Sequence, residues 1–450
     1  MSVLKIKYVL ILILSCMTLA AQNKPHLNIA ENYENLNVER EGNTYEIRLS
    51  KGKHYEFLVL QQGIDVEVIL EDSSGKELIK MDSPNGAHGY EKFEFQSVAN
   101  ANYTLKIKPF DLKVESENNI ISILIRQLSK KDLKRRELIR KELEIENKKN
   151  VQTLDIDHFW QAFDLLKTCK SKSDSIRIIQ NSYLDRATSG FKEFMRVRSR
   201  QLNAENFVRT ISKYPKFYNS IRENSYKVKE AEPLIEAVFK NFSQLYPNFK
   251  PFKVCFAIGT IGTGGTTSDN FVLIGTEIST ATAYNDLSEF EGSSKKSSLA
   301  YKGDFVQKLK NIVAHECVHT QQKRGLAKTA VACHLLQSCL REGAADFIGE
   351  LVAGGQINAS ALDYGDAHEK MLWASFKSEL CNTSHSGWLY NYSEVKDKPA
   401  DLGYYMGYKI AQAYYNNAEN KQQAIIDIIE MDNPFQYLEQ SGYDQKFQKN

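Results

Sequence analysis

The spacing of hydrophobic residues along the chain changes near residue 128. Before that point, short segments alternate apolar and polar side chains, which is the pattern of β-strands that bury one face. Clusters of turn-forming residues, such as Ser73, Ser74 and Gly75, separate these segments. The alternating segments cover residues 44–50, 54–61, 65–72, 92–98, 103–110 and 120–128. Their spacing predicts an antiparallel β-sandwich or barrel.

From residue 151 onward, apolar residues recur at the helical period of about 3.6 residues. One interruption, residues 253–279, consists of two β-rich runs around a hairpin of Gly, Thr and Ser. The helical pattern is clearest over residues 157–169, 231–245, 305–322, 341–353 and 404–416. This part of the chain is therefore predicted to be mostly α-helical, with a small β-sheet.

Together these patterns predict an α+β multidomain fold. An N-terminal antiparallel β-sandwich occupies residues 22–128, and a mostly α-helical domain occupies residues 151–450. Between them, residues 129–150 are almost all charged or helix-favouring, which predicts a solvated helical connector. The length of 450 residues agrees with two or three domains.

The first 21 residues are predicted to be a secretory signal peptide. Lys5 and Lys7 precede an apolar run at 8–14, and small residues follow at Ala20 and Ala21. The apolar run is too short for a transmembrane helix, which needs about 20 residues. A lipid anchor at Cys16 is the alternative, because the residues before it resemble a lipobox.

Composition excludes several other classes of protein. Hydrophobic residues make up 42% of the chain, charged residues 25%, and the formal net charge is only +2, so nothing indicates binding to nucleic acid. The six cysteines after Cys16 are scattered and form no CxxC motif, which argues against a thiolate zinc site. Cys333 and Cys339 are the nearest pair, but the sequence does not decide whether any of the six form disulfides.

The stretch NIVAHECVHTQQ, residues 311–322, contains the candidate chemistry. His315 and His319 are four residues apart, so on a helix they lie on one face and can bind one zinc ion. Glu316 lies about 100° round the helix from His315, where its carboxylate can reach a water on the metal and act as general base.

A zinc hydrolase needs a third protein ligand, and the segment REGAADF offers one. Glu342 follows His319 by 23 residues on a second helical segment. Asp346 lies one turn beyond Glu342, where it can accept a hydrogen bond from a ligating histidine. His334 and Glu350 are competing ligands, although a core histidine and a solvent-facing glutamate explain them more simply.

HExxH followed at this distance by ExxxD resembles the gluzincin class of zinc metallopeptidases. The resemblance implies that His315, His319 and Glu342 bind Zn²⁺, that Glu316 is the base, and that Asp346 orients a histidine. Residues from about 155 to 440 also resemble a poorly characterised family of predicted bacterial zinc proteases, through motifs such as IGTGGTT, HECVHTQQ and EGAADF. The segment around residues 40–128 resembles the pre-peptidase C-terminal β-sandwich that accompanies secreted peptidases, through QQGIDVEVILED and DSPNGAHGYE.

A zincin-like domain further implies an oxyanion donor, which gluzincins often take from a later helix. The segment DLGYYMGY offers Tyr404, Tyr405 and Tyr408, of which Tyr405 and Tyr408 are the preferred candidates. The expected function is therefore an exported zinc peptidase acting on a peptide or protein substrate, in the periplasm, at the cell surface or outside a bacterial cell.

Several functional alternatives stay open. The zincin fold can be catalytically idle on a surface binding or adhesion protein, or the substrate can be another amide such as a cell-wall peptide. The run VLIGTEIS can present a strand edge to an extended substrate, which favours an endopeptidase, or simply pack within a sheet. Glu277, the only acid in that run, can instead dock a substrate amine, as an aminopeptidase requires.

Overall fold

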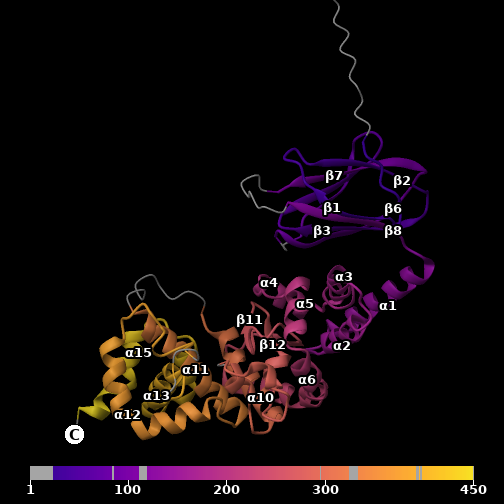
Figure 1. The fold of residues 1–450 in the computed structure, drawn as a ribbon. Helices are drawn as coiled ribbons and strands as arrows, with labels where there is room; N and C mark the ends of the chain where they lie inside the picture. Colours follow the sequence, from indigo (N-terminus) through magenta and orange to yellow (C-terminus); the bar gives the residue numbers. More distant parts are fainter. Residues whose placement is uncertain are drawn as a thin grey trace, which may run out of the picture. The chain divides into compact units, whose positions relative to one another are not determined.

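The structure is a computed structural model that describes residues 24–83, 86–110, 119–293, 295–323, 333–391, 395 and 398–448. The predicted signal peptide and Cys16 lie outside these residues. The contacts within the chain divide it into two compact units, Met1–Ser129 and Lys130–Asn450. Each unit is described by itself (Figure 1).

The first unit is a sandwich of two antiparallel sheets, as predicted. One sheet has the order β1-β8-β3-β6 and the other β2-β7-β4-β5. The strands are β1 (Asn32–Asn37), β2 (Asn43–Leu49), β3 (His54–Gln62), β4 (Val66–Glu71), β5 (Glu77–Met81), β6 (His88–Gln96), β7 (Ala101–Pro109) and β8 (Ile120–Gln127). The alternating pattern missed β1 and β5, because both are edge strands without a fully buried face.

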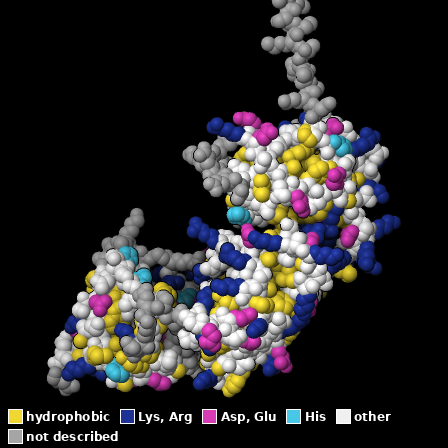
Figure 2. All heavy atoms as spheres, viewed as in Figure 1, with side chains coloured by type: hydrophobic (Ala, Val, Ile, Leu, Met, Phe, Trp, Pro, Cys, Tyr) yellow, Lys and Arg dark blue, Asp and Glu magenta, His cyan; other side chains and the backbone are white. Residues whose placement is uncertain are grey.

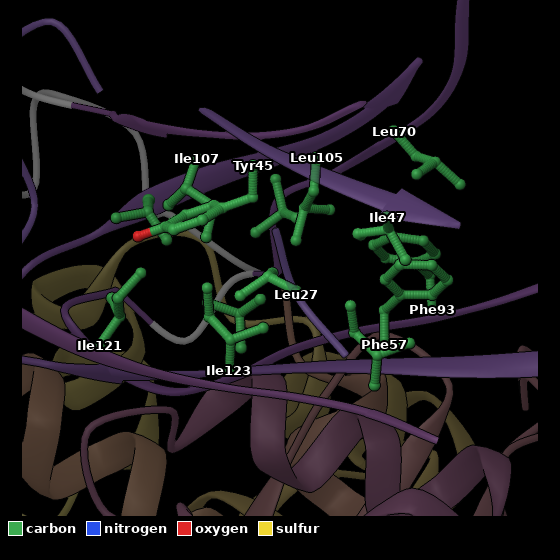
Figure 3. Close-up of a cluster of buried hydrophobic side chains, with 14 of the residues drawn as sticks. Leu27, Tyr45, Ile47, Phe57, Leu70, Phe93, Leu105, Ile107, Ile121 and Ile123 are labelled. Carbon is green, nitrogen blue, oxygen red and sulfur yellow. The ribbon is translucent and has the colours of Figure 1, made fainter. Parts of the chain in front are cut away.

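Alternate residues of the two sheets meet to form the core of the sandwich (Figure 3). Ile47 and Leu105 come from one sheet, and Ile123 and Phe57 come from the other. The rings of Phe57 and Phe93 stack at 4.6 Å between centroids on adjacent strands of the same sheet. Burial of these side chains stabilises the sandwich without any residue of the second unit.

The second unit is mostly helical and contains one small mixed sheet of order β11-β12-β10-β9. Strand β10 pairs in parallel with β9 and β12, and β11 pairs antiparallel with β12. The strands are β9 (Val151–Gln152), β10 (Lys253–Ala257), β11 (Gly265–Thr267) and β12 (Phe271–Gly275). The two predicted β-rich runs are strands β10 and β12, but the hairpin predicted between them is wrong, because they pair in parallel. The segment between them contains β11, which pairs antiparallel with β12 and forms one edge of the sheet.

The helices before the sheet's last strand build one side of this unit. They are α1 (Lys130–Glu146), α2 (Leu154–Leu166), α3 (Lys172–Ser182), α4 (Ser189–Val197), α5 (Ala204–Lys213), α6 (Pro215–Lys227) and α7 (Glu232–Leu245). The later helices are α8 (Thr276–Ser279), α9 (Lys295–Leu299), α10 (Phe305–Gln321), α11 (His334–Ala353), α12 (Ala359–Glu379), α13 (Leu402–Asn417), α14 (Lys421–Ile429) and α15 (Pro434–Ser441). Short 3-10 turns are η1 (Leu184–Arg186), η2 (Val228–Ala231), η3 (Ser288–Phe290) and η5 (Asp444–Phe447).

The predicted charged connector is helical over α1 and belongs to the second unit. Its end is fixed by Glu146, which is buried and accepts hydrogen bonds from the backbone N–H groups of Thr153 at 2.7 Å and Leu154 at 3.1 Å. The connector is therefore attached to the start of α2 rather than ending in free solvent.

Two glycines allow α11 and α13 to approach closely. A methyl group on Gly343 would overlap the backbone of Gly407, and a methyl group on Gly407 would overlap the carbonyl of Cys339. Any larger residue would therefore separate the two helices. This close approach places the start of α13 beside the residues that α11 presents.

A disulfide joins Cys333, just before α11, to Cys381, just after α12. Cys339, the nearest cysteine in sequence to Cys333, is buried and unbonded to another cysteine. The pairing depends on contact between the end of α12 and the start of α11, where the N–H groups of Leu335 and Leu336 donate to the carbonyls of Asn382 and Leu380. Spacing along the chain does not reveal this contact.

Charged side chains of both signs are interspersed over the visible surface, as the small net charge predicts (Figure 2). Within the part of the chain that the structure describes, none of the helices is both long and apolar enough to cross a membrane.

A buried carboxyl group fixes the start of α4. Asp155 accepts hydrogen bonds from the backbone N–H of Thr188 at 3.0 Å and from its hydroxyl at 2.5 Å, and Thr188 in turn caps α4 by accepting from Phe191. Burial raises the pKa of Asp155 to about 7, although the bonds from Thr188 partly oppose the shift. The native state therefore favours the protonated acid.

We expect this group to make stability depend on pH. Its pKa in the folded protein is above the value of about 3.9 in the unfolded chain, so its contribution is complete below pH 4 and is lost as pH rises through 7. Relative to Asp155→Asn, which cannot ionise, the wild-type free energy of unfolding should fall by roughly 2 kcal/mol between pH 5 and pH 8. Denaturant unfolding followed by tryptophan fluorescence measures it, because Trp160, Trp373 and Trp388 all lie in the second unit. A difference that stays constant with pH would contradict the ionisation argument.

Candidate metal centre

Helices α10 and α11 bring three metal-binding side chains together. The two facing imidazole atoms, Nε2 of His315 and Nε2 of His319, are 3.0 Å apart. Oε2 of Glu342 lies 3.2 Å from the His319 atom and 3.4 Å from the His315 atom. Donors bound to one tetrahedral zinc at about 2.0–2.1 Å are about 3.3 Å from each other, so the three atoms fit such a site. Among the described residues, this is the one group of three or more metal-binding side chains.

Each histidine is oriented by a partner on its other nitrogen. Nδ1 of His315 lies 2.7 Å from Oδ1 of Asp346, whose second oxygen accepts from Asn358. Nδ1 of His319 lies 2.7 Å from Oε1 of Gln322. A proton on each Nδ1 leaves each Nε2 lone pair free for a metal ion. The structure thus places Asp346 beside His315, in the role that the sequence predicts.

Gln322 is a site residue that the sequence analysis did not identify. Its amide nitrogen donates to the carbonyl of Arg341 at 2.9 Å, so it connects the end of α10 to α11 directly before Glu342. The available signal was its spacing of three residues after His319, which places it within reach of that side chain.

Tyr390 is a second residue that the sequence did not indicate. Its hydroxyl donates to Oε1 of Glu342 at 3.1 Å, while Oε2 of Glu342 faces the histidines. The backbone of Tyr390 has a φ of 58°, and its N–H donates to Asp401 at 2.5 Å, which itself has a φ of 61°. Two non-glycine residues held in the left-handed region beside a candidate metal ligand indicate local strain at this site.

The electrostatics of the cluster favour a cation. Burial alone would lower the pKa of His315, but the carboxylates of Asp346 and Glu342 raise it well above its ordinary value. Burial would raise the pKa of Glu342, but His319 and His315 lower it well below its ordinary value. The buried acids therefore require positive charge, which a divalent metal ion supplies more directly than protonated histidines.

Glu316 lies on the same helix, with its carboxylate against strand β11. A methyl group on Gly265 would lie 2.6 Å from Oε1 of Glu316, so glycine at this position leaves the space that the carboxylate fills. Burial raises the pKa of Glu316. A carboxylate with a raised pKa beside the metal ligands suits a general base.

These side chains line a cavity of about 680 Å³ within the second unit. The wall is formed by α10, α11, strand β11 with the loop before it, and the start of α13. Tyr404 contributes from α13, and its ring centroid lies 6.0 Å from that of His315 with an interplanar angle of 26°. Burial raises the pKa of its hydroxyl, which therefore stays protonated and can donate a hydrogen bond.

The structure does not bring Tyr405 and Tyr408 into this cluster. The hydroxyl of Tyr405 donates to Asp366 at 3.0 Å, and that of Tyr408 donates to Glu350 at 2.8 Å. Successive helical residues point about 100° apart, so only one face of α13 can line the cavity. Of the three tyrosines considered, Tyr404 is the one on that face.

His334, Glu350 and Glu277 also lie outside the group of metal-binding side chains. Glu350 accepts the bond from Tyr408, and neither it nor His334 joins the group of metal-binding side chains. Glu277 is buried and accepts from the N–H groups of Gly259 at 2.6 Å and Ile261 at 2.9 Å. It therefore organises the loop that leads to β11 and is not among the residues that line the cavity.

The strand expected to offer an edge has a different place in the sheet. Strand β12, which contains the first four residues of VLIGTEIS, is paired on both sides, with β10 and β11, and the last four residues form α8. The edge beside the cavity belongs to β11 instead, and all three of its residues line the cavity wall. A strand of three residues is too short to show an alternating pattern in the sequence.

Residues 296–432 match the family model described as Predicted Zn-dependent protease (DUF2268). This protease-family segment contains α10, α11, α12 and α13, and therefore all three candidate metal ligands. The resemblance to predicted zinc proteases is thus confirmed over this segment. No curated protein matches the chain.

Three solved structures are similar to parts of the chain. The pre-peptidase C-terminal domain of collagenase from Bacillus anthracis aligns with 23% of this chain and 94% of its own, at 15% identity and a TM-score of 0.19. The P-domain of Macrobrachium rosenbergii nodavirus aligns with 22% of this chain and 88% of its own, at 15% identity and a TM-score of 0.12. A metallopeptidase from Bacteroides thetaiotaomicron aligns with 94% of this chain and 61% of its own, at 9% identity and a TM-score of 0.20.

The geometry predicts one zinc ion per chain, and metal analysis of purified variants tests the ligand set. His315→Ala, His319→Ala and Glu342→Ala should each lower zinc occupancy, because each removes one of the three converging atoms. Asp346→Asn should weaken zinc affinity by about 10- to 100-fold, because it changes a histidine's partner rather than a ligand. Glu350→Gln, on the same helix as Glu342, is the matched control and should retain zinc. Full occupancy in Glu342→Ala would remove Glu342 from the ligand set.

Proposed function

We propose that the protein is an exported zinc-dependent endopeptidase. The observation that carries the proposal is that Nε2 of His315, Nε2 of His319 and Oε2 of Glu342 converge in a cavity that also contains the Glu316 carboxylate. A purely structural zinc site has no use for a carboxylate beside the ligands and usually fills its fourth position with protein. The match of residues 296–432 to a predicted zinc protease family supports the same class of activity.

Two side chains perform the proton transfer and charge stabilisation. Zinc, when bound, acts as a Lewis acid toward water and the substrate carbonyl. The Glu316 carboxylate takes the proton from the attacking water and returns it to the leaving nitrogen. The hydroxyl of Tyr404 enters the cavity from α13 and replaces Tyr405 and Tyr408 as the candidate donor to the developing oxyanion.

The edge of β11 supports binding of an extended peptide. Its residues Gly265, Thr266 and Thr267 line the cavity next to Glu316, so a substrate strand can pair with their backbone. Such pairing reads the main chain and needs no free terminus. Glu277, the acid considered as an amine-binding group, is occupied by two backbone N–H groups, which favours internal cleavage.

Export is supported by the signal-peptide pattern of the first 21 residues and by the disulfide between Cys333 and Cys381. Disulfides persist mainly in oxidising compartments. Both features favour a location outside the cytoplasm, and the lipid anchor at Cys16 stays a candidate.

Glu316→Gln tests the role of the general base independently of metal binding. The substitution keeps the size of the side chain but removes its ability to take a proton, so kcat should fall by several powers of ten while zinc content stays unchanged. Hydrolysis of a mixed peptide library, measured by mass spectrometry beside zinc analysis, provides both readouts. Equal hydrolysis by the variant and the wild type would exclude Glu316 as the base, and a wild type that binds zinc but cleaves nothing would favour a catalytically idle fold.

Blocked peptides distinguish internal from terminal cleavage. Peptides with an acetylated N-terminus and an amidated C-terminus should be cut at the same rate, within about twofold, as their unblocked forms, because β11 binds backbone rather than a terminus. Cleavage sites are assigned by mass spectrometry. Activity that disappears on acetylation would show that a group in the cavity reads the free amine.

A further inference from the structure

An arginine in the cavity wall has a hydrogen-bond donor without a partner among the described residues. Arg198 directly follows α4, and its Nη2 donates to Oγ1 of Thr266 in β11 at 3.3 Å. Its Nε is buried and has no hydrogen-bond partner among the residues that the structure describes. Within the same described residues, no carboxylate lies at ion-pair distance from its guanidinium, although the side chain lines the cavity.

Several other arginines of the second unit are paired with acids, whereas buried Arg186 donates to the amide oxygen of Gln161. Arg222 donates to both oxygens of Asp164, at 2.9 and 2.7 Å, and Arg196, two residues before Arg198, pairs with Glu193 at 2.8 Å. Arg198 acts through space on the charge of Glu316, whose pKa it lowers, but it makes no direct ion pair among the described residues. A buried donor without a hydrogen-bond partner is costly. An anion bound from solution would accept hydrogen bonds from Arg198, as Asp164 accepts them from Arg222.

The position of Arg198 identifies where such an anion would lie. Thr266, its hydrogen-bond partner among the described residues, is the middle residue of the edge strand, and the neighbouring Gly265 lies against the Glu316 carboxylate. Arg198 therefore borders the strand on which an extended substrate would lie, close to the proposed base. Arg341, directly before Glu342, adds a second guanidinium to the same wall.

We propose that Arg198 binds a carboxylate of the substrate, so that acidic peptides are the preferred substrates of this site. This inference rests on the proposed peptidase function and names its substrate class. A guanidinium binds a carboxylate through two parallel hydrogen bonds, donated either by its two terminal nitrogens or by Nε and the adjacent Nη2. The two terminal nitrogens of Arg198 keep N–H groups beyond the one that Thr266 accepts from. The carboxylate can come from an Asp or Glu side chain or from the C-terminus of the peptide.

Binding measurements test the inference without requiring turnover. The probes are fluorescent, end-blocked peptides of Gly, Ser and Ala in which a single Glu is moved along the chain, each with a Gln counterpart. A third set contains Gln and a free C-terminal carboxylate. Fluorescence anisotropy with the zinc-loaded, full-length Glu316→Gln protein gives the affinities. We expect at least one Glu peptide to bind about 10-fold or more tightly than its Gln counterpart, as for other charge-assisted contacts.

The same titrations with Arg198 replaced assign the preference to this residue. Arg198→Gln should abolish the preference for Glu while leaving the affinity for Gln peptides within about twofold, and Arg198→Lys should retain part of it. Arg196→Gln is the matched control, because it removes a paired arginine from the same helix and should leave the preference intact. A preference confined to the third set would assign Arg198 to the C-terminal carboxylate.

Two results would overturn the inference. One is equal binding of every Glu and Gln pair and of the free and blocked C-termini by the protein with Arg198 intact, a comparison that needs no Arg198 variant to fold. The other is an equal loss of affinity for all peptides in Arg198→Gln, which would assign Arg198 to the shape of the cavity or to the charge of Glu316. Absence of cleavage by the wild type would refute the peptidase, whereas these affinities would still decide whether Arg198 selects carboxylates.

Discussion

The candidate site depends on the distance between α10 and α11. Three donor atoms from these helices, contributed by His315, His319 and Glu342, lie 3.0 to 3.4 Å from one another. The helices are held at this distance by polar contacts on both sides of the cluster: Asp346 to His315, and Gln322 to the Arg341 carbonyl. Asp346 also orients the His315 ring, and Gln322 the His319 ring. The packing of α10 against α11 therefore also sets the positions of the three donor atoms.

The remaining walls of the cavity are positioned by groups that take no part in the chemistry. Gly343 and Gly407 let α13 approach α11, which brings Tyr404 next to His315. On the other side, buried Glu277 holds the backbone of the loop before β11, and Gly265 leaves space for the Glu316 carboxylate. A buried acid and close-packed glycines therefore act as structural parts of a site whose reactive groups lie elsewhere.

The sandwich and the second unit differ in whether they contain residues of the candidate site. The sandwich has its own hydrophobic core, formed where the inner faces of its two sheets meet, and all described metal-binding side chains of the candidate site lie in the second unit. The described residues of the candidate metal site therefore belong to the second unit alone. The unpartnered donor of Arg198 is a feature that the metal cluster does not require, and for this reason we relate it to the substrate.

The sequence by itself determined the features that depend on local spacing. The alternation of apolar residues predicted six of the strands of the sandwich, and the four-residue spacing of His315 and His319 predicted two donors on one helical face. The ExxxD motif likewise placed Asp346 one turn from Glu342. Such features follow from the fixed periods of strands and helices, which hold wherever the element lies in the fold.

Only the tertiary structure decided the features that depend on how elements meet. Tyr404, rather than Tyr405 or Tyr408, lies on the face of α13 that lines the cavity. Cys333 pairs with Cys381, which lies just after α12, rather than with the nearer Cys339. No local pattern in the sequence indicates the short strand β11, the contact of Tyr390 with Glu342 or the unpartnered Nε of Arg198. The disulfide, the contact of Tyr390 and the hydrogen bond of Arg198 join residues that are 48, 48 and 68 positions apart. Their geometry is set by how helices and strands pack, which residue spacing does not encode.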